Sequence, residues 1–250
     1  MHNSERELQI LNILKESGGF VSTNQLCQML FTSESSIRRD LKKLEKQNLL
    51  KRSHGGALPI TNFSNIVTFN KRTKINVRAK QEIAKKAASL IKEGQIIFLD
   101  QSSTAFYLAN EIINMENITV VTNNVEIMML LSGSKAKVIC SGGYLSVENR
   151  NCLIGGDAQK TFESIFADTV FFSAKALSDE GVITDCSREE INVRNAMIKS
   201  SRKTVFLCDS SKFSRLASYK QCGLGDVDYL ISEDDKAQDL IKKFPGVALL

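Results

Sequence analysis

The sequence predicts a two-domain α/β protein: a small, mostly helical N-terminal domain followed by a larger domain with a mostly parallel sheet. The chain has 250 residues, enough for about two domains of ordinary size. Helical periodicity and Gly-Gly turns dominate the N-terminal quarter. Further on, short apolar runs rich in β-branched residues alternate with helical patterns, which is typical of a doubly wound sheet.

Composition and charge indicate where the domains meet and what they contact. We expect the N-terminal domain to span residues 1–58, a linker to span 59–74, and the larger domain to span 75–250. The linker opens with an uncharged stretch that holds one of the two prolines. The net charge is +3 over the first domain and +7 over residues 71–92, but −5 over 93–250. This asymmetry indicates that nucleic acid would contact only the front of the chain.

Several classes of protein are disfavoured by composition. With 42% hydrophobic and 24% charged residues and no apolar run of membrane-spanning length, we expect a soluble, cytoplasmic protein without membrane contact. The six cysteines are scattered and lack a C-x-x-C pair, so we expect free thiols and no metal site. Only His2 and His54 are present, which argues against histidine-based catalysis. We expect no cofactor and no catalytic residues.

Two helices are predicted before residue 31. The first ends at Gly18-Gly19, and the second is capped by Ser22 or Thr23 after a short extended link. Their apolar stripes are Leu8, Leu11 and Leu14 in the first helix, and Leu26, Met29 and Leu30 in the second. A turn then leads to a third helix, so the order is that of a helix-turn-helix.

The third helix carries the strongest functional signal. Ser33 can accept a hydrogen bond from the free amides of the first turn. The apolar stripe consists of Ile37, Leu41 and Leu44. The other faces are basic and hydroxyl-bearing, which fits the DNA major groove, although a solvated surface helix is the alternative. The segment LLKRSHGGA follows and predicts a two-stranded wing that turns at Gly55-Gly56.

The segment SxxSIRRDLKKLEKQNLLKRSHGGA resembles the signature of the DeoR family of bacterial transcriptional regulators, with Ser36 in place of the usual threonine. The resemblance implies a winged helix-turn-helix that binds double-stranded operator DNA. It implies DNA contacts from Ser33, Ser35, Ser36, Arg38, Arg39, Lys42, Lys43, Lys51, Arg52 and His54. For His54 we favour a structural role in the wing over a role as a ligand. Asp40 would repel phosphate, so we expect it to form an internal salt bridge, for example with Arg38.

The larger domain contains alternating strand and helix patterns. Apolar runs predict strands at 96–100, 118–122, 137–141, 169–173, 204–208 and 228–232. Helices are predicted at 104–113, 124–131 and 187–200, the last with a Ser187/Glu190 capping box. Another helix, with a buried stripe of Ile83, Ala84, Ala87, Leu90 and Ile91, precedes the first strand. Its basic face could contact phosphate or solvent. In such sheets, ligands bind beyond the carboxyl ends of the strands.

Polar residues follow four of the predicted strands. The candidate ligand-binding residues are Asp100, Gln101, Ser102, Ser103, Thr104, Thr122, Asn123, Asn124, Gly142, Gly143, Lys175, Asp209 and Lys212. The Asp100–Thr104 segment opens a helix, so it could hold a phosphate or serve as an ordinary N-cap. The two glycines could permit close approach of a ligand or make a turn, and Lys212 could pair with phosphate or lie in solvent. Four loops converging on one sheet edge favour a site for a phosphorylated polyol.

The family resemblance has further implications for this domain. It implies a sensor of phosphorylated sugars whose fold resembles ribose-phosphate isomerases. Ser102 replaces the usual glycine of the phosphate loop, which narrows that loop. The expected function is that of a repressor of a sugar or polyol operon, a homodimer or homotetramer that a phosphorylated sugar releases from its operator.

The sequence disfavours two other functions. A sugar-phosphate isomerase with an added DNA-binding domain would need a carboxylate base. The segment Phe172–Ala176, where related isomerases carry acids, has none, and Lys175 replaces an acid there. A purely structural nucleoid protein would not need the cluster of polar loops. The sequence therefore favours a ligand-gated regulator.

Overall fold

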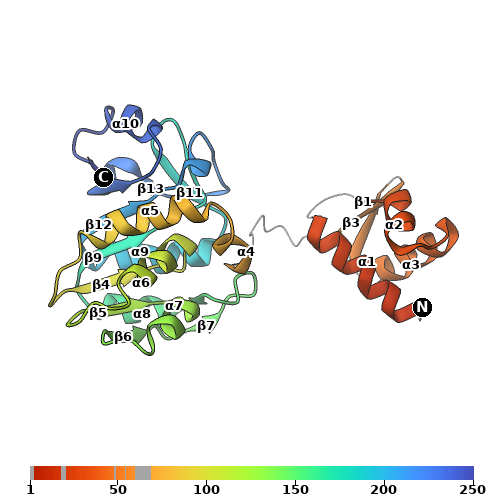
Figure 1. Cartoon of the computed structure of the whole chain (residues 1–250), viewed down its shortest axis with the longest axis horizontal. Helices are drawn as coiled ribbons and strands as arrows, with labels where there is room; N and C mark the ends of the chain where they lie inside the picture. Colours follow the sequence, from red (N-terminus) through yellow and green to blue (C-terminus); the bar gives the residue numbers. More distant parts are fainter. Residues whose placement is uncertain (1–2, 18–20, 48, 54, 60–68) are drawn as a thin grey trace. The chain divides into compact units, whose positions relative to one another are not determined.

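The computed structural model describes residues 3–17, 21–47, 49–53, 55–59 and 69–250. The chain divides into two compact units, Met1–Asn65 and Ile66–Leu250 (Figure 1). The predicted domain bounds stay predictions: of the predicted linker, residues 60–68 lie outside the described ranges and residues 69–74 lie in the second unit.

The N-terminal unit combines helices with a small antiparallel sheet. Its elements are α1 (Asn3–Ser17), β1 (Val21–Ser22), α2 (Thr23–Leu30), α3 (Glu34–Lys46), β2 (Leu50–Ser53) and β3 (Gly56–Pro59). The predicted wing is the β2–β3 hairpin, in which Arg52 pairs with Ala57. The predicted extended link, β1, also pairs with β3, so the sheet has three strands in the order β1-β3-β2 rather than two.

One apolar core holds this unit together. It consists of Ile10, Leu14, Val21, Leu26, Leu30, Ile37, Leu41, Leu44, Leu50 and Ala57. The predicted stripe of α3 is confirmed. The placement of Leu8 and Met29 in buried stripes is wrong, because these side chains are 63% and 58% exposed. Ile10 and Leu14, one turn apart, form the buried face of α1, and a residue two positions before Ile10 points away from that face.

The helix caps differ from one another. Ser22 closes α2 with a capping box: its Oγ accepts from the Gln25 backbone N (3.2 Å), and Gln25 Oε1 accepts from the Ser22 backbone N (2.9 Å). Ser33 holds the N-cap position of α3, but its hydroxyl contacts those of Ser35 (3.2 Å) and Ser36 (3.0 Å) instead of a backbone amide. The predicted hydrogen bond from the first turn of α3 to the Ser33 side chain is therefore wrong.

The second unit is built on a seven-stranded parallel sheet. In chain order its strands are β4 (Ile96–Leu99), β5 (Thr119–Thr122), β6 (Lys137–Cys140), β9 (Ala167–Phe172), β12 (Ser201–Leu207), β14 (Tyr229–Ile231) and β15 (Ala248–Leu249). The order across the sheet is β15-β14-β12-β9-β4-β5-β6. All six predicted strands are present. The two-residue strand β15 is too short to show a sequence pattern.

Helices cover both faces of this sheet (Figure 1). One face carries α5 (Val77–Ala88), α6 (Ser103–Glu111) and α7 (Val125–Leu131), and the other carries α8 (Gly156–Glu163) and α9 (Arg188–Lys199). Successive strand residues point to opposite faces. Accordingly, Ile97 and Leu99 pack with the first group of helices, whereas Phe98 packs with the second. The predicted α/β class with a mostly parallel sheet is confirmed.

The segments between the strands and helices of the main sheet form further small elements. These are β7 (Tyr144–Leu145), β8 (Leu153–Ile154), β10 (Ala176–Leu177), β11 (Val182–Asp185), η1 (Ser210–Lys212), β13 (Tyr219–Gly223) and η2 (Leu224–Asp226). The unit is completed by α4 (Phe69–Thr73) before α5 and by α10 (Lys236–Ile241) before β15. Among the described segments, none of the helices combines the length and the apolar character that a membrane span requires.

Candidate functional site

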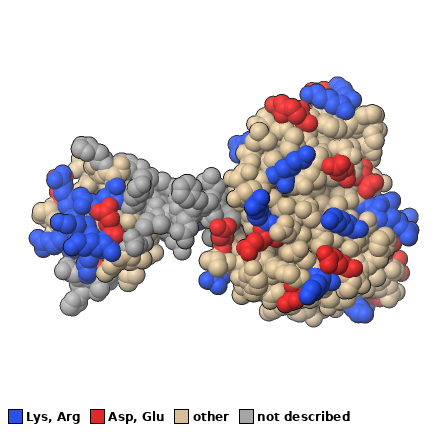
Figure 2. All heavy atoms as spheres, turned by 180° about the vertical axis from the view of Figure 1, so that it is seen from behind, with Lys and Arg blue, Asp and Glu red and all other residues tan. Residues whose placement is uncertain are grey.

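One side of α3 is exposed and basic. Ser33, Ser35, Arg38, Arg39, Lys42 and Lys43 are exposed, Ser36 is half-buried, and Arg52 is exposed on β2. Figure 2 shows lysines and arginines gathered on the N-terminal unit. We call these eight residues the recognition surface. The Lys51 side chain and all of His54, predicted to belong to the wing, lie outside the described part of the structure.

The cations of the recognition surface differ in how far they are neutralised. Arg38 pairs with Glu34 at 2.6 Å, Lys43 with Glu7 at 2.8 Å, and Arg52 with Glu45 at 3.9 Å. Arg39 and Lys42 form no ion pair with any residue that the structure describes. Their charges remain available to a polyanion such as the DNA backbone.

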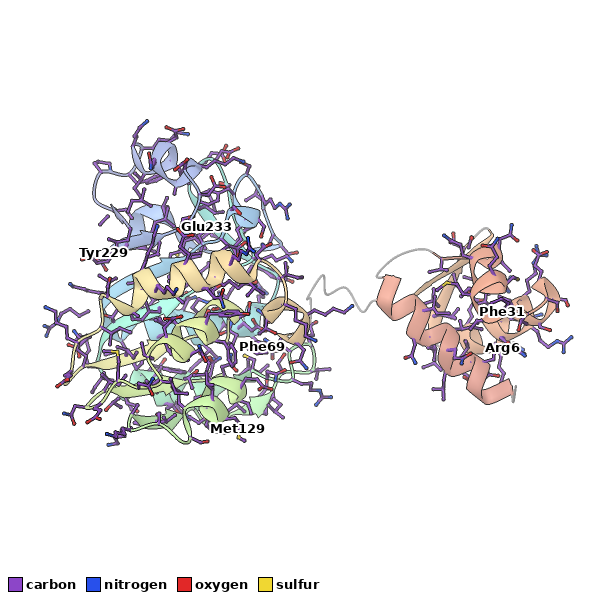
Figure 3. All side chains as sticks on the ribbon, viewed as in Figure 1. Arg6, Phe31, Phe69, Met129, Tyr229 and Glu233 are labelled. Atoms are coloured by element: carbon purple, nitrogen blue, oxygen red, sulfur yellow. The ribbon has the colours of Figure 1, made fainter. Side chains whose placement is uncertain are left out.

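Asp40 forms the predicted internal salt bridge, but with another partner. Its Oδ2 lies 2.6 Å from Nε of Arg6, whereas Arg38 pairs with Glu34. Arg6 lies on α1 (Figure 3). The hydrogen bond and charge of Asp40 raise the pKa of Arg6 above its ordinary value. Asp40 lies on the buried side of α3 with Leu41 and faces α1, whereas Arg38 lies on the exposed side. The pair therefore joins α1 to the back of the recognition helix.

Phe31 lies in the turn that the sequence predicts before the third helix. Its side chain is 97% exposed and projects from the turn between α2 and α3 (Figure 3). Its backbone is left-handed, with φ of 47°, a conformation that is uncommon for a bulky residue. An exposed aromatic ring beside the start of α3 adds an apolar contact to the recognition surface. The signal available in the sequence was a phenylalanine in a polar turn.

A second candidate site lies where the parallel strands end. Leu99 on β4 is in register with Thr122 on β5 and Phe171 on β9, so the residues that follow these strands meet at one edge. Asp100, Gln101, Asn123 and Asp209 are each at most 2% exposed. Together with Asn149, Glu190, Arg194 and Lys212 they form what we call the sheet-edge cluster.

Arg194, which the sequence did not indicate, is the centre of this cluster. Its guanidinium contacts Asp100 Oδ2 (3.1 Å), Asp185 Oδ2 (3.1 Å) and Gln221 Oε1 (2.8 Å), and only 1% of the residue is exposed. Burial opposes its charge, but the surrounding carboxylates hold its pKa above the ordinary value. Asp100 also accepts hydrogen bonds from the backbone N of Ser102 (3.0 Å) and of Ser173 (3.2 Å). Asp100, predicted to contact a ligand, is therefore occupied by internal partners.

Glu190 is also bound differently from the prediction. The Ser187 hydroxyl accepts from the Glu190 backbone N (3.3 Å), which is one half of the predicted capping box. The carboxylate instead accepts from Gln101 Nε2 (2.9 Å) and Asn149 Nδ2 (3.2 Å). Burial and the neighbouring Asp185 raise the pKa of Glu190, and this increase is opposed by two arginines. Polar side chains from two loops are thus joined around one buried carboxylate on α9.

Lys212 lies inside the cluster, so of the two alternatives for this residue the structure does not support a side chain in solvent. Its Nζ is 3.3 Å from Asp209 Oδ2 and donates a hydrogen bond to the Ser173 hydroxyl. Burial would raise the pKa of Asp209, but Lys212 and hydrogen bonds, including one from Asn76 Nδ2 (2.9 Å), hold it well below its usual range. Lys175, also predicted to bind the ligand, is exposed.

Several of the predicted ligand-binding residues have structural roles. The Ser102 hydroxyl caps α6 by accepting from the Ala105 backbone N (3.1 Å), and Asn124 Oδ1 caps α7 by accepting from the Glu126 backbone N (2.9 Å). The Thr122 hydroxyl accepts from the Asn124 backbone N (3.0 Å). Ser102 thus acts as an ordinary N-cap, which was one of the two alternatives for this segment.

The two glycines make a close-packed turn. Gly143 has φ of +101°, and a Cβ there would lie 2.2 Å from the Ile154 carbonyl oxygen. The Gly142 backbone N donates to the Thr161 hydroxyl (3.2 Å). Of the two alternatives for this pair, close approach of a ligand or a turn, the structure supports the turn.

Some buried polar atoms at the sheet edge have no hydrogen-bond partner among the described residues. They are Thr104 Oγ1, Asn123 Oδ1, Asn124 Nδ2, Ser141 Oγ and Asn149 Oδ1. Leaving such atoms unpaired costs about 1–3 kcal/mol each, so this concentration points to a polar ligand. Within the described ranges, no three His, Cys, Asp or Glu side chains converge as metal ligands would.

The structure combines a helix-turn-helix unit with an α/β unit of the sensor type, and this combination defines a DNA-binding regulator. The model of the DeoR-like helix-turn-helix domain matches residues 6–63, and that of the DeoR C terminal sensor domain matches residues 75–234. The chain belongs to the DeoR family of transcriptional regulators, which confirms the resemblance seen in the sequence.

Named relatives agree with this assignment. The HTH-type transcriptional regulator GolR of Listeria innocua is 32% identical over 98% of this chain and 96% of its own length. The Glycerol-3-phosphate regulon repressor of Haemophilus influenzae is 32% identical over 94% of this chain and 91% of its own length. Among solved structures, ribose 5-phosphate isomerase A of Methanocaldococcus jannaschii aligns over 55% of each chain, with 19% identity and a TM-score of 0.41.

Proposed function

We propose that this protein is a repressor that binds operator DNA through the recognition surface and is released by a phosphorylated sugar or polyol bound at the sheet edge. The observation that carries the proposal is a difference between the polar groups of the two units. One presents exposed, un-neutralised cations on a recognition helix, and the other gathers buried polar atoms without partners at the ends of parallel strands. The first arrangement suits a polyanion, and the second suits a small polar ligand.

On the DNA side, Arg39 and Lys42 are the principal contacts. Their charges are free, whereas Arg38 and Lys43 must leave Glu34 and Glu7 to bind phosphate. The serines of the first turn present hydroxyls that can donate to phosphate or to base edges. Arg52, Lys51 and His54 of the wing complete the proposed contacts.

On the ligand side, the proposed site residues are those with unmatched polar atoms. Thr104 and Asn123 offer unpartnered oxygens, to which ligand hydroxyls can donate. Ser103 at the start of α6 and Lys212 nearby provide donors for a phosphate. The printed name of the Haemophilus influenzae relative, a repressor of a glycerol-3-phosphate regulon, supports the same class of ligand.

We infer binding without catalysis at this site. Isomerisation of a sugar phosphate requires a carboxylate that is free to take a proton. The nearest candidate is Glu190, which is buried with a raised pKa, but both its oxygens accept hydrogen bonds from Gln101 and Asn149. Lys175 occupies the segment where an acid would be needed. We propose further that the protein acts in the cytoplasm as a homodimer or homotetramer, since paired recognition helices bind repeated half-sites.

The test is fluorescence anisotropy of the full chain on DNA from upstream of its own gene, at fixed salt because phosphate contacts make affinity salt-dependent. The titration is run with phosphorylated sugars and polyols of three to six carbons and with the same compounds lacking phosphate. We expect one phosphorylated compound to weaken DNA binding at least tenfold while its unphosphorylated form does not. Tight DNA binding that no compound alters would contradict the proposed ligand response.

A further inference from the structure

Arg72, on α4, is a half-buried arginine, and two of its guanidinium nitrogens are buried without a hydrogen-bond partner among the described residues. The sequence placed this residue in the linker, and the two nitrogens are Nε and Nη2. The guanidinium carbon lies 5.6 Å from the centroid of the Phe69 ring, which stacks edge-on against Phe106. Burying guanidinium N–H groups without acceptors is costly, so such an arrangement requires an explanation.

The position of Arg72 is fixed by contacts of the α4 helix with its neighbours. The Thr73 carbonyl accepts from the Tyr107 hydroxyl (2.8 Å), which joins α4 to α6. The Lys80 ammonium, on α5, donates to the Arg72 carbonyl. Phe69 is 3% exposed (Figure 3). The helix α4 is therefore joined to both α5 and α6. The lack of a described partner for the guanidinium is not explained by loose packing of this segment.

The guanidinium acts electrostatically on the sheet-edge cluster. Its charge opposes the rise in pKa that burial causes in Glu190, and it does the same for Cys152. Cys152 Sγ accepts from Asn123 Nδ2 (3.3 Å), and Asn123 Oδ1 is one of the unpartnered oxygens. Asn123, which carries an oxygen without a partner in the described structure, thus contacts a thiol on which the charge of Arg72 acts.

The buried cations near this edge are already neutralised or hydrogen-bonded. Arg194 is surrounded by Asp100 and Asp185. Lys212 is paired with Asp209. Lys80 donates to backbone carbonyls, and burial together with the Lys212 charge lowers its pKa to about 8. Compared with these cations, only Arg72 has buried donors without an acceptor among the described residues.

We propose that Arg72 binds the anionic group of the effector, through the two free N–H donors of its planar guanidinium. A phosphate ester fits this fork, since guanidinium and phosphate form paired hydrogen bonds. This inference rests on the proposed ligand response and identifies a binding residue and a route of regulation for it. Because α4 is the first described element of the α/β unit, a ligand held by Arg72 acts directly on the segment where the chain enters that unit. The ligand favours whichever position of α4 it binds more tightly.

The test compares the full chain with Arg72→Gln and Arg72→Lys, and uses Arg78→Gln as the matched control. Arg78 is an exposed arginine on the neighbouring helix α5. Thermal unfolding is followed with inorganic phosphate, with phosphorylated sugars and polyols of three to six carbons, and with their unphosphorylated forms. Hydrogen exchange of residues 69–76 is measured with the compound that stabilises the wild-type protein most.

We expect the active phosphorylated compound to raise the melting temperature of the wild-type protein and of Arg78→Gln. In Arg72→Gln the concentration needed should rise at least tenfold, and in Arg72→Lys the loss should be smaller because the charge remains. The ligand should slow exchange of residues 69–76 in the wild-type protein but not in Arg72→Gln. Without ligand, Arg72→Gln should melt no lower than the wild-type protein, because buried charged donors without an acceptor have been removed.

The outcomes separate this inference from the proposed function. If the wild-type protein responds to a phosphorylated compound and Arg72→Gln responds equally, the assignment of Arg72 is wrong and the proposed function stands. If Arg72→Gln melts well below the wild-type protein and keeps the response, Arg72 has a structural role only. If the wild-type protein binds its operator but responds to none of the compounds, both the proposed ligand response and the assignment of Arg72 are contradicted.

Discussion

The recognition surface and the sheet-edge cluster both contain arginine side chains but use them in opposite ways. On α3 the Arg38 side chain is 64% exposed and pairs with one glutamate, and Arg39 has no ion-pair partner in the described structure. At the sheet edge the Arg194 side chain is 2% exposed and contacts two carboxylates. An exposed arginine with a free charge can bind an external polyanion, whereas a buried one stabilises its own surroundings.

This difference explains why a basic residue cannot be assigned a function from its type alone. Surface ion pairs contribute about 0–1 kcal/mol, so Arg38 can leave Glu34 for a phosphate at little cost. Breaking a buried pair costs about 3–5 kcal/mol, so Arg194 is not available to a ligand. Arg72 combines the two situations, since it is half-buried and its buried Nε and Nη2 have no acceptor among the described residues. The predictions below test this contrast.

The largest effect is expected for Arg194→Met. Removing the guanidinium leaves the buried Asp100 and the half-buried Asp185 without their counterion, which should lower the free energy of unfolding by about 3–5 kcal/mol. Urea unfolding followed by circular dichroism measures this change. Arg202→Met, at an exposed position of β12, is the control and should stay within about 0.5 kcal/mol of the wild-type value. Equal stabilities of the two variants would show that the Arg194 network is not the centre of the cluster.

Arg39→Ala should weaken operator binding by about 1–3 kcal/mol without altering the response of the melting temperature to the ligand. The reason is that Arg39 is a proposed DNA contact and has no ion-pair partner among the described residues. Fluorescence anisotropy at fixed salt gives the affinity. Lys137→Ala removes an exposed cation from the α/β unit and should leave the affinity unchanged. Unchanged affinity of Arg39→Ala would remove this residue from the recognition surface.

Asp209→Asn should be destabilising at pH 7 by about 1–3 kcal/mol, because the buried partner of Lys212 loses its charge. The pKa of Asp209 is lowered in the folded protein, so the folded state binds fewer protons than the unfolded state. Its contribution is complete above the ordinary aspartate pKa of about 4 and is lost as the pH falls toward the depressed value. The stability difference between the two proteins should therefore be smaller at pH 3 than at pH 7, as measured by urea unfolding. A difference that does not change with pH would exclude the charge of Asp209 as its cause.

The smallest effect is expected for Phe31→Ala. The ring is 97% exposed, so its removal should change the free energy of unfolding by less than about 0.5 kcal/mol. Operator affinity should fall by no more than about 1 kcal/mol, the scale of one apolar contact to a base or sugar. Comparison with Arg39→Ala in the same anisotropy assay places the two residues on one scale. A large loss of stability would show that Phe31 has a packing role.

The elements that the sequence predicted best are those whose signal is local. The stripe of α3 and the six longer strands depend on spacing within a few residues. Two-residue strands such as β15 have no periodicity to detect. The partner of Asp40 was not predicted because Arg6 is 34 positions away on another helix. The spacing of residues in the sequence does not determine how two helices pack against each other.

The candidate site was predictable in position but not in its contacts. Polar residues after Leu99 and Thr122 had to meet once the strands were parallel, and they do. Arg194 could not be assigned, because on its own helix it resembles an ordinary surface arginine. Its burial depends on Asp100 and Gln221, which lie 94 and 27 positions away. Networks of this kind follow from the assembled fold and not from local spacing. For the same reason the sequence did not show that Ser102 and Asn124 cap helices, and it assigned Arg72 to the linker instead of the α/β unit.

The central claim is that the ligand and the operator are coupled through this chain. Coupling is reciprocal, so a ligand that weakens operator binding must itself bind less tightly to the operator complex, by the same factor. The most direct measurement is isothermal titration of the active phosphorylated compound into the protein, first alone and then saturated with operator DNA. We predict that the ligand affinity falls at least tenfold when DNA is bound, matching the loss of DNA affinity seen by anisotropy. Equal ligand affinity for the free protein and the operator complex would contradict the account.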